Sequence, residues 1–290
     1  MSRTIAFVSA AAFAFSALAA GPVRGEEKPA AGPKVEVATT FRSSELIGMP
    51  VRNREGKDVG KIEDFVVEMN SGDVRYAAIS FGGFAGFGDK LFAVPWKEMA
   101  FKFGERDRHF VFDVTPEELE KSPGFDQNNW PDVADPAWSK SIDKHYGITR
   151  TDKPADKPTV ERARAPIVYD AVFRVSTIDG MKVKNEAGED VGHVDELVFD
   201  IKAGKAKYAA LSFGGFAGFG NKLFAIPMSA FTLKHGAEQT FLVLDISPER
   251  LKEAPGFDKE HWPDMANPNW ATEIDKFYPA RTAERPRTRK

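Results

Sequence analysis

An internal duplication constrains this chain more than any other feature of its sequence. The octapeptide Phe-Gly-Gly-Phe-Ala-Gly-Phe-Gly occurs at residues 81–88 and again at 213–220, a spacing of 132 residues. At this one offset residues 48–146 align without a gap with residues 180–278, and about half of the aligned positions are identical. Solenoid repeats have periods of ~20–50 residues, so this period is far too long for one. The chain therefore contains two copies of one small domain.

Each copy is predicted to be rich in β-strands. Short segments with many β-branched and aromatic residues alternate with polar turns that contain glycine, as in antiparallel hairpins. In the first copy the predicted strands are 41–51, 59–69, 74–81, 90–96 and 109–114. A further short strand or turn is predicted at 97–104. About six short strands in ~70 residues favour a small antiparallel barrel.

The chain changes character after these strands. Thr115-Pro116-Glu117-Glu118 has the features of a helix start, with Thr as N-cap, Pro at the first position and acids in the first turn. Residues 125–146 then combine large aromatics with prolines, which predicts an ordered strap across the barrel, closed by a short helix at 136–146. The predicted fold class is thus mainly β: two tandem small antiparallel β-barrels, each followed by a short helix and an aromatic, proline-rich strap.

The N-terminus resembles a secretory signal. Arg3 supplies positive charge, residues 5–20 are apolar, and Ala17-Leu18-Ala19 forms an A-x-A cleavage pattern. The alternative is a membrane anchor, but the run is short for a bilayer span, which needs ~20 apolar residues. We therefore expect an exported protein, periplasmic if the host is Gram-negative and otherwise secreted, with no transmembrane span in the mature chain.

The predicted boundaries follow from the repeat and from shifts in composition. A strand at 168–175 is expected to belong to the second copy. The predicted segments are a signal peptide (1–19), a flexible leader (20–40), repeat 1 (41–147), a linker (148–165), repeat 2 (166–279) and a basic disordered tail (280–290).

Residue content narrows the chemistry. The chain has no cysteine, which excludes disulfides, thiolate nucleophiles and Cys-ligated metals, and its net charge of −3 gives no general attraction to nucleic acid. None of the five histidines recurs at the equivalent position of the other copy, so a site common to both copies cannot use imidazole. The acids found in both copies have structural explanations such as turns and helix caps; they are Asp58/Asp190, Asp113/Asp245, Glu117/Glu249, Asp126/Asp258, Asp132/Asp264 and Asp143/Asp275. We therefore predict no catalytic residues, no metal and no cofactor.

The glycine-rich loops are the remaining candidate site. They lack the Gly-Lys-Ser/Thr of a Walker loop and lie between strands, whereas a dinucleotide fingerprint opens a helix. One interpretation is a hairpin loop whose Phe84 and Phe87 fold back as a lid. The other is that Phe84, Phe87, Phe216 and Phe219 contact a partner, a neighbouring barrel or a lipid surface.

Three segments of the first copy resemble the PRC-barrel family, which is named for the cytoplasmic barrel of the photosynthetic reaction centre H subunit. They are Glu63-Asp64-Phe65-Val66-Val67, Val74-Arg75-Tyr76-Ala77-Ala78-Ile79-Ser80-Phe81-Gly82-Gly83 and Lys90-Leu91-Phe92-Ala93-Val94-Pro95-Trp96. The second copy matches through Tyr208 to Pro227, with Met228 in place of Trp96. The resemblance implies a small β-barrel that binds protein and has no set of catalytic residues. The signal peptide departs from the best-known members, which act in the cytoplasm, so their partners cannot be transferred.

These features favour a non-enzymatic exported adaptor or scaffold that binds protein partners at the cell envelope. The barrels are expected to bind two copies of a partner, or to contact each other or a second chain through the Gly/Phe loops. One alternative is a periplasmic small-ligand or metal-binding protein that uses turn acids. Another is an envelope hydrolase, against which stands the lack of a shared nucleophile–base pair.

Overall fold

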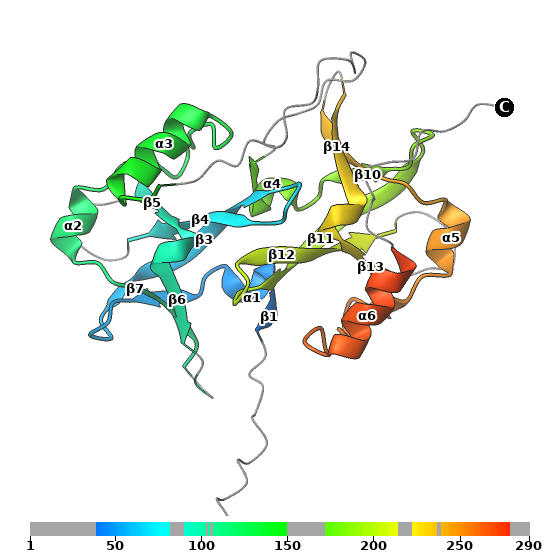
Figure 1. Cartoon of the computed structure of the whole chain (residues 1–290), viewed down its shortest axis with the longest axis horizontal. Helices are drawn as coiled ribbons and strands as arrows, with labels where there is room; N and C mark the ends of the chain where they lie inside the picture. Colours follow the sequence, from blue (N-terminus) through cyan, green and yellow to red (C-terminus); the bar gives the residue numbers. More distant parts are fainter. Residues whose placement is uncertain are drawn as a thin grey trace, which may run out of the picture. The chain divides into compact units, whose positions relative to one another are not determined.

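Two β-sheets dominate the computed structural model, which describes residues 39–81, 90–102, 104, 107–149, 172–213, 222–236 and 239–278 (Figure 1). The strands of the first half are β1 (Thr40–Arg42), β2 (Pro50–Arg52), β3 (Asp58–Glu68), β4 (Val74–Ser80), β5 (Lys90–Pro95), β6 (Met99–Lys102), β7 (His109–Phe112) and β8 (Gly124–Asp126). Those of the second half are β9 (Val172–Arg174), β10 (Lys182–Lys184), β11 (Asp190–Asp200), β12 (Lys205–Ser212), β13 (Lys222–Pro227), β14 (Phe231–His235), β15 (Thr240–Leu244) and β16 (Gly256–Asp258). The helices are α1 (Ser43–Leu46), α2 (Pro116–Glu120), α3 (Pro136–His145), α4 (Val175–Ile178), α5 (Pro248–Lys252) and α6 (Pro268–Phe277), and the 3-10 turns are η1 (Trp96–Glu98) and η2 (Met228–Ala230).

The two sheets have the same topology. The first has the order β6-β7-β2-β3-β4-β5-β8 and the second the order β14-β15-β10-β11-β12-β13-β16, which confirms the mainly β prediction and the tandem arrangement. Pairing among the described strands is antiparallel throughout except at one place in each sheet, where β2 pairs with β7, and β10 with β15, in parallel. No hairpin joins these strands in the chain, so no tight turn imposes antiparallel pairing on them.

Local chemistry explains a second difference from the prediction. Residues 41–51, expected as one strand, form β1, the helical turn α1 and then β2. The Glu45 carboxylate accepts a hydrogen bond of 2.9 Å from the Arg42 amide, and this cap starts a helical turn at Ser43. The reverse turn that follows contains Gly48 with a left-handed φ of 84°. Side-chain capping thus overrides the β-propensity of the segment.

The first strand of each half joins the sheet of the other half. β1 pairs antiparallel with β11, with Phe41 opposite Phe199, and β9 pairs antiparallel with β3, with Phe173 opposite Val67. The described part of the strand expected at 168–175 is β9, and it pairs with β3 in the sheet of the first half, whereas the expectation was a strand added to the second copy. A free edge of β3 is equally available to either arm, and residue pattern alone does not say which arm occupies it. We call residues 39–46 the first arm and 172–178 the second arm.

A local twofold relation brings the two halves together at the β3–β4 and β11–β12 turns. Asp73 and Lys205, equivalent at the 132-residue offset, face each other in an antiparallel bridge. Reciprocal hydrogen bonds flank them: the Ala206 amide donates to the Gly72 carbonyl at 2.8 Å, and the Val74 amide to the Gly204 carbonyl at 2.9 Å. The two halves contact each other through these turns and the arms, which the sequence analysis did not single out. Whether the Gly/Phe loops add to the contact lies outside the described residues.

Asp73 and Lys205, which face each other at the local twofold relation, carry opposite charges and attract each other. The Lys205 ammonium lies 2.8 Å from the Asp73 carboxylate. Burial alone would raise the pKa of Asp73, but hydrogen bonds from Lys205 and Ser71 outweigh it and lower that pKa below its usual value. Identical halves would place like charges opposite each other here, which is destabilising in a strand pair.

The core runs across the boundary between the halves. One hydrophobic cluster includes Phe65 and Phe110 from the first half and Phe199 and Leu211 from the second. The Phe65 and Phe199 rings lie 5.4 Å apart between centroids. The two copies therefore stabilise each other through apolar contact as well as through strand pairing.

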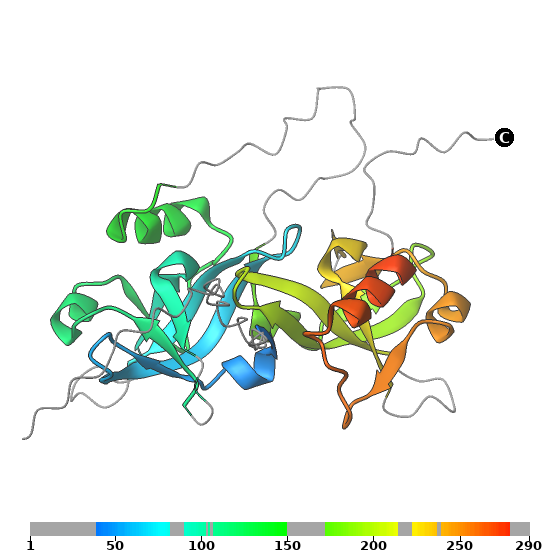
Figure 2. The same ribbon diagram turned by 60° about the horizontal axis from the view of Figure 1, so that its bottom comes forward.

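The predicted helix start and strap are confirmed in both halves (Figure 2). Thr115 caps α2 by accepting from the Glu118 amide at 3.2 Å, and Leu119 on that helix is buried in the core. After α2, β8 pairs with β5 and α3 completes the strap, and β16 and α6 repeat this in the second half. Trp138 of α3 packs edge-on against Tyr76 of β4, with ring centroids 5.3 Å apart.

Candidate functional site

The four phenylalanines predicted to contact a partner lie outside the described residues; they are Phe84, Phe87, Phe216 and Phe219. The structure describes the base of each loop. Phe81 and Phe213, which start the two octapeptides, are buried, and Ser80 and Ser212 pair with Leu91 and Leu223 on the adjacent strands. Each loop thus leaves from a fixed strand pair, and its role as a contact stays a prediction.

The straps and arms form a second candidate region, which the sequence analysis missed. The Arg42 guanidinium of the first arm lies 5.2 Å from the centroid of Trp262 in the second strap. The Arg174 guanidinium of the second arm lies 4.7 Å from Trp130 in the first strap. A cation over an indole face is an attractive arrangement, so each arm is held to the other half twice, by strand pairing and by this contact.

Acids on β3 and β11 complete the attachment of the arms. The buried Asp64 carboxylate accepts hydrogen bonds from the Ser176 amide at 3.2 Å and the Ser176 hydroxyl at 2.5 Å. Its counterpart Glu196 accepts from the Ser44 amide at 2.8 Å. Burial raises the pKa of Asp64, although the bonds from Ser176 and the positive charge of Arg174 oppose that shift. These acids therefore act as caps for the arm helices α4 and α1.

A cleft of about 450 Å³ opens between the first arm and the second strap. We call it the arm–strap cleft. Its apolar lining comes mainly from Phe41, Trp262 and Met265, and Arg108, just before β7, lies at its edge with its guanidinium 5.7 Å from the Phe41 ring centroid. A volume of this size lies within the range of ~300–1,000 Å³ that is usual for ligand sites. The cleft is therefore large enough for a few side chains of a bound partner.

Four of the six charged residues that line this cleft have no charged equivalent in the other half. Four charged lining residues are replaced by neutral polar residues at the 132-residue offset: Glu45 by Thr177, Arg108 by Thr240, Lys259 by Gln127 and Glu260 by Asn128. Arg42, Trp262 and Pro263, by contrast, recur as Arg174, Trp130 and Pro131. The shared residues therefore hold the arms, and the unshared charges set this cleft apart.

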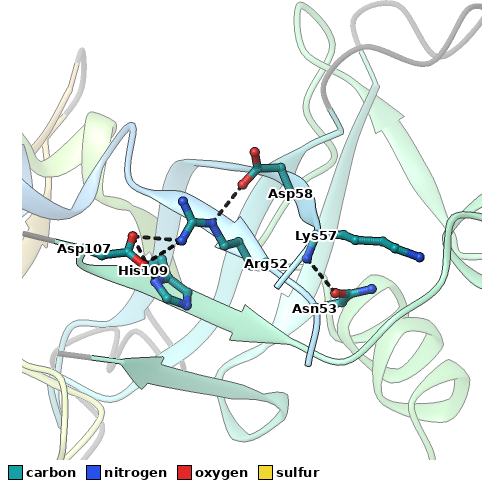
Figure 3. Close-up of polar contacts among 6 residues, drawn as sticks. All are labelled: Arg52, Asn53, Lys57, Asp58, Asp107 and His109. Carbon is teal, nitrogen blue, oxygen red and sulfur yellow. Dashed lines mark hydrogen bonds and ion pairs between the residues drawn. The ribbon is translucent and has the colours of Figure 1, made fainter. Parts of the chain in front are cut away.

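A polar cluster on β2 and β7 is specific to the first half (Figure 3). Arg52 donates from Nε to Asp58 at 2.9 Å and from Nη1 to both oxygens of Asp107 at 2.8 Å. The buried His109 points its Nδ1 toward Asp107, at 3.5 Å. In the second half a Lys184–Phe241 cation–π contact of 5.1 Å takes this place. The cluster thus ties β2 to the β6–β7 hairpin, which carries Arg108.

Three of the six acid pairs shared by the copies have the structural roles that were expected of these acids. Asp126 and Asp132 accept from amides two residues ahead, at 2.7 and 3.0 Å, and their counterparts Asp258 and Asp264 do the same at 2.9 and 3.1 Å. The Tyr76 hydroxyl donates to Asp143 at 3.1 Å, and the equivalent Tyr208 hydroxyl lies 3.4 Å from Asp275. Burial, with the nearby Asp275 charge, raises the pKa of Tyr208 to about 12. These pairs fasten the strap helices to β4 and β12.

The histidines and paired serines do not converge. Ser80 donates to Glu63 at 2.6 Å, while His145 contacts Ser122 at 2.9 Å and His235 contacts Thr240 at 2.9 Å. Within the described ranges, no three His, Asp or Glu side chains are grouped to hold a metal ion. None of the described helices has the length and apolar character needed to cross a membrane.

One signal in the sequence could have revealed the arms. Phe41, Arg42 and Ser44 recur as Phe173, Arg174 and Ser176, so the repeat extends upstream of the segment at 48–146. Arg108 carries no such signal, because its role depends on a cleft made by segments far apart in the chain.

The fold and the exchange of arms between the halves define a class of protein. It is a duplicated, mainly β chain whose two barrel-type domains exchange their first strands. The family model of the PRC-barrel domain matches twice, at residues 38–119 and 170–248, which together make up more than half of the chain. The chain therefore belongs to the PRC-barrel family, in tandem form. A search of curated proteins found no match.

Proposed function

We propose that this protein is a non-enzymatic adaptor that is exported and binds protein partners at the cell envelope. PRC-barrel domains are often protein-interaction modules, and the family membership of both halves supports a binding role. The observation that carries the proposal is that the polar residues shared by both copies make structural hydrogen bonds. Asp126, Asp132 and Asp143, with their counterparts, accept hydrogen bonds that shape the turns and straps, so what was kept through the duplication is a scaffold.

Crosslinking of the full-length protein in its native envelope tests the binding role. The chain is expressed in its host with a C-terminal affinity tag, crosslinked in intact cells and purified under denaturing conditions. A defined protein that is crosslinked reproducibly, with the sites mapped to the two barrels, supports the proposal. Recovery of the uncrosslinked chain alone, across several crosslinker lengths, contradicts it.

The predicted phenylalanine contacts are tested in the same experiment. We propose that Phe84 and Phe216 contribute to partner binding, so Phe84→Ser with Phe216→Ser should reduce the crosslinked fraction without lowering the unfolding temperature. Full-strength crosslinking by the double variant removes the loops from the contact. Export is tested separately: we expect the mature protein in the periplasmic or secreted fraction, with an N-terminus that begins one or two residues after Ala19.

A further inference from the structure

The arm–strap cleft differs from the Gly/Phe loops, and its chemistry points to a particular kind of ligand. We propose that it binds an extended peptide segment of a partner protein, in which an acidic side chain accompanies an apolar one. This inference rests on the proposed binding function and specifies one site for it.

The apolar part of the cleft suits one bulky side chain. Phe41 is buried and forms the base, while Trp262 and Met265 are half-buried and leave part of their surface to solvent. Trp262 is held in place by Phe257, whose ring centroid lies 4.8 Å away, and by Arg42 over its face. A fixed aromatic side chain with remaining exposed surface is a typical anchor for a partner residue.

The cleft is lined by three acids and three bases, and among these Arg108 is the residue available to bind a carboxylate. Arg42 is paired with Glu45 at 3.3 Å, and Lys259 with Asp195 at 2.7 Å. Asp264 accepts from the Ala266 amide at 3.1 Å. Among the described residues Arg108 makes no ion pair, and its cation–π contact with Phe41 leaves its donor groups unused. A guanidinium binds a carboxylate through two parallel hydrogen bonds, which gives a preference for Asp or Glu over neutral residues.

The backbone of β1 favours an extended chain as the occupant. β1 pairs with β11 along one edge, and the Ile201 amide donates to the Thr39 carbonyl at 2.9 Å. In an antiparallel ladder bonded residues alternate, so the amide and carbonyl of Thr40 point away from β11. Thr40 also lines the cleft. An extended peptide can pair with such an edge while its side chains enter the adjacent pocket.

The charged residues found in only one half indicate that the arm–strap cleft is specialised relative to the equivalent region of the other half. The arms and the tryptophans recur in both halves, yet Arg108 has Thr240 as its counterpart and Met265 has Val133. Loss of Arg108 removes the proposed ionic contact and the cation–π contact with Phe41, but it breaks no described ion pair of the fold. This makes Arg108→Gln a specific test, with Arg54→Gln as the control for an exposed arginine outside the cleft.

The probe is a set of fluorescein-labelled, N-acetylated and C-amidated nonapeptides, each with one Glu placed two or three residues from one Leu or Phe in an Ala/Ser background. Anisotropy titrations use the full mature chain. We expect at least one peptide to bind with a Kd below ~1 mM and its Gln counterpart to bind about tenfold or more weakly. Arg108→Gln should weaken the Glu peptide by a similar factor and leave the Gln peptide unchanged, while Arg54→Gln changes neither.

A second pair of variants tests the apolar contact. Met265→Asp should abolish binding, and Val133→Asp at the equivalent strap position should not. The inference is overturned if none of the peptides binds, or if Arg108→Gln has no effect on any peptide that does. It is also overturned if a photo-crosslinking amino acid at position 265 attaches to residues 20–38 of its own chain, because the leader then fills the cleft. If peptides fail while envelope crosslinking still recovers a defined protein, the cleft assignment falls and the proposed function stands.

Discussion

Replacement of Gly204 by alanine tests whether the two halves pack as the structure describes. Gly204, in the β11–β12 turn, has a left-handed φ of 66°, and a Cβ at this position would lie 2.4 Å from Trp96 Nε1 in the other half. Gly72, its counterpart, has a φ of 73°, and its Cβ would lie 2.2 Å from the Ala206 carbonyl oxygen. Both turns therefore combine a backbone conformation that favours glycine with contact to the opposite half.

Gly188 separates these two effects. It is also left-handed, with a φ of 85°, but nothing lies within 4 Å of its Cβ position. Gly188→Ala should therefore cost only the left-handed penalty of about 1–2 kcal/mol in the free energy of unfolding. Gly204→Ala and Gly72→Ala add forced displacement of packed groups, about 1–3 kcal/mol more. The Gly72 variant is expected to be the more damaging of the two, because it meets backbone and not a side-chain ring.

Equilibrium unfolding in urea, followed by tryptophan fluorescence and by circular dichroism, measures the difference. We expect Gly204→Ala and Gly72→Ala to shift the midpoint clearly further than Gly188→Ala, with the slope unchanged. Equal destabilisation by all three variants would refute the reasoning, since it would mean that these turns do not contact the other half.

Three further predictions concern the contacts between and within the halves. Asp64→Ala removes the cap that holds Ser176 and should cost about 1–2 kcal/mol in urea unfolding; faster hydrogen exchange confined to 172–178 is expected, and unchanged exchange there contradicts the role of the arm. The pKa of Asp73 is lower in the folded chain than its ordinary value of 3.8. Its pairing with Lys205 therefore contributes to stability at a pH above 3.8, and this contribution is lost as the pH falls through the lower pKa of the folded chain. The stability gap between the native chain and Asp73→Asn should therefore narrow below about pH 4 and shrink in high salt; a gap that is constant with pH would exclude this ion pair as its source. Tyr76→Phe removes the hydrogen bond from this hydroxyl to the buried Asp143 and should cost about 1–2 kcal/mol in the free energy of unfolding, whereas thermal unfolding that matches the native chain would show that this bond does not help to hold the strap.

The arms change how the duplication should be understood. Two independent barrels on a linker would each keep their own first strand. Here Phe41 and Phe173 lie in each other's sheets, and the Arg42–Trp262 and Arg174–Trp130 contacts repeat the exchange at the straps. Each half is therefore completed by the other, and a partner bound at the arm–strap cleft would contact both.

The sequence alone was sufficient for the features that depend on neighbouring residues. The 132-residue repeat, most strand positions, the Thr115 cap of α2 and the aromatic strap all follow from periodicity, capping and composition, which act over a few residues. The family also follows from such local motifs, and the double match to the PRC-barrel domain agrees with it.

The tertiary structure alone decided which strand pairs with which sheet and what lies across the boundary. Segments more than a hundred residues apart are joined by the pairing of β1 with β11, by the Asp73–Lys205 bridge and by the cleft that both Arg108 and Trp262 line. An exposed strand edge offers the same hydrogen-bonding groups to either arm, so residue pattern cannot choose between them. The choice comes from the packing of both halves together, through Phe65 against Phe199 and Trp96 against Gly204.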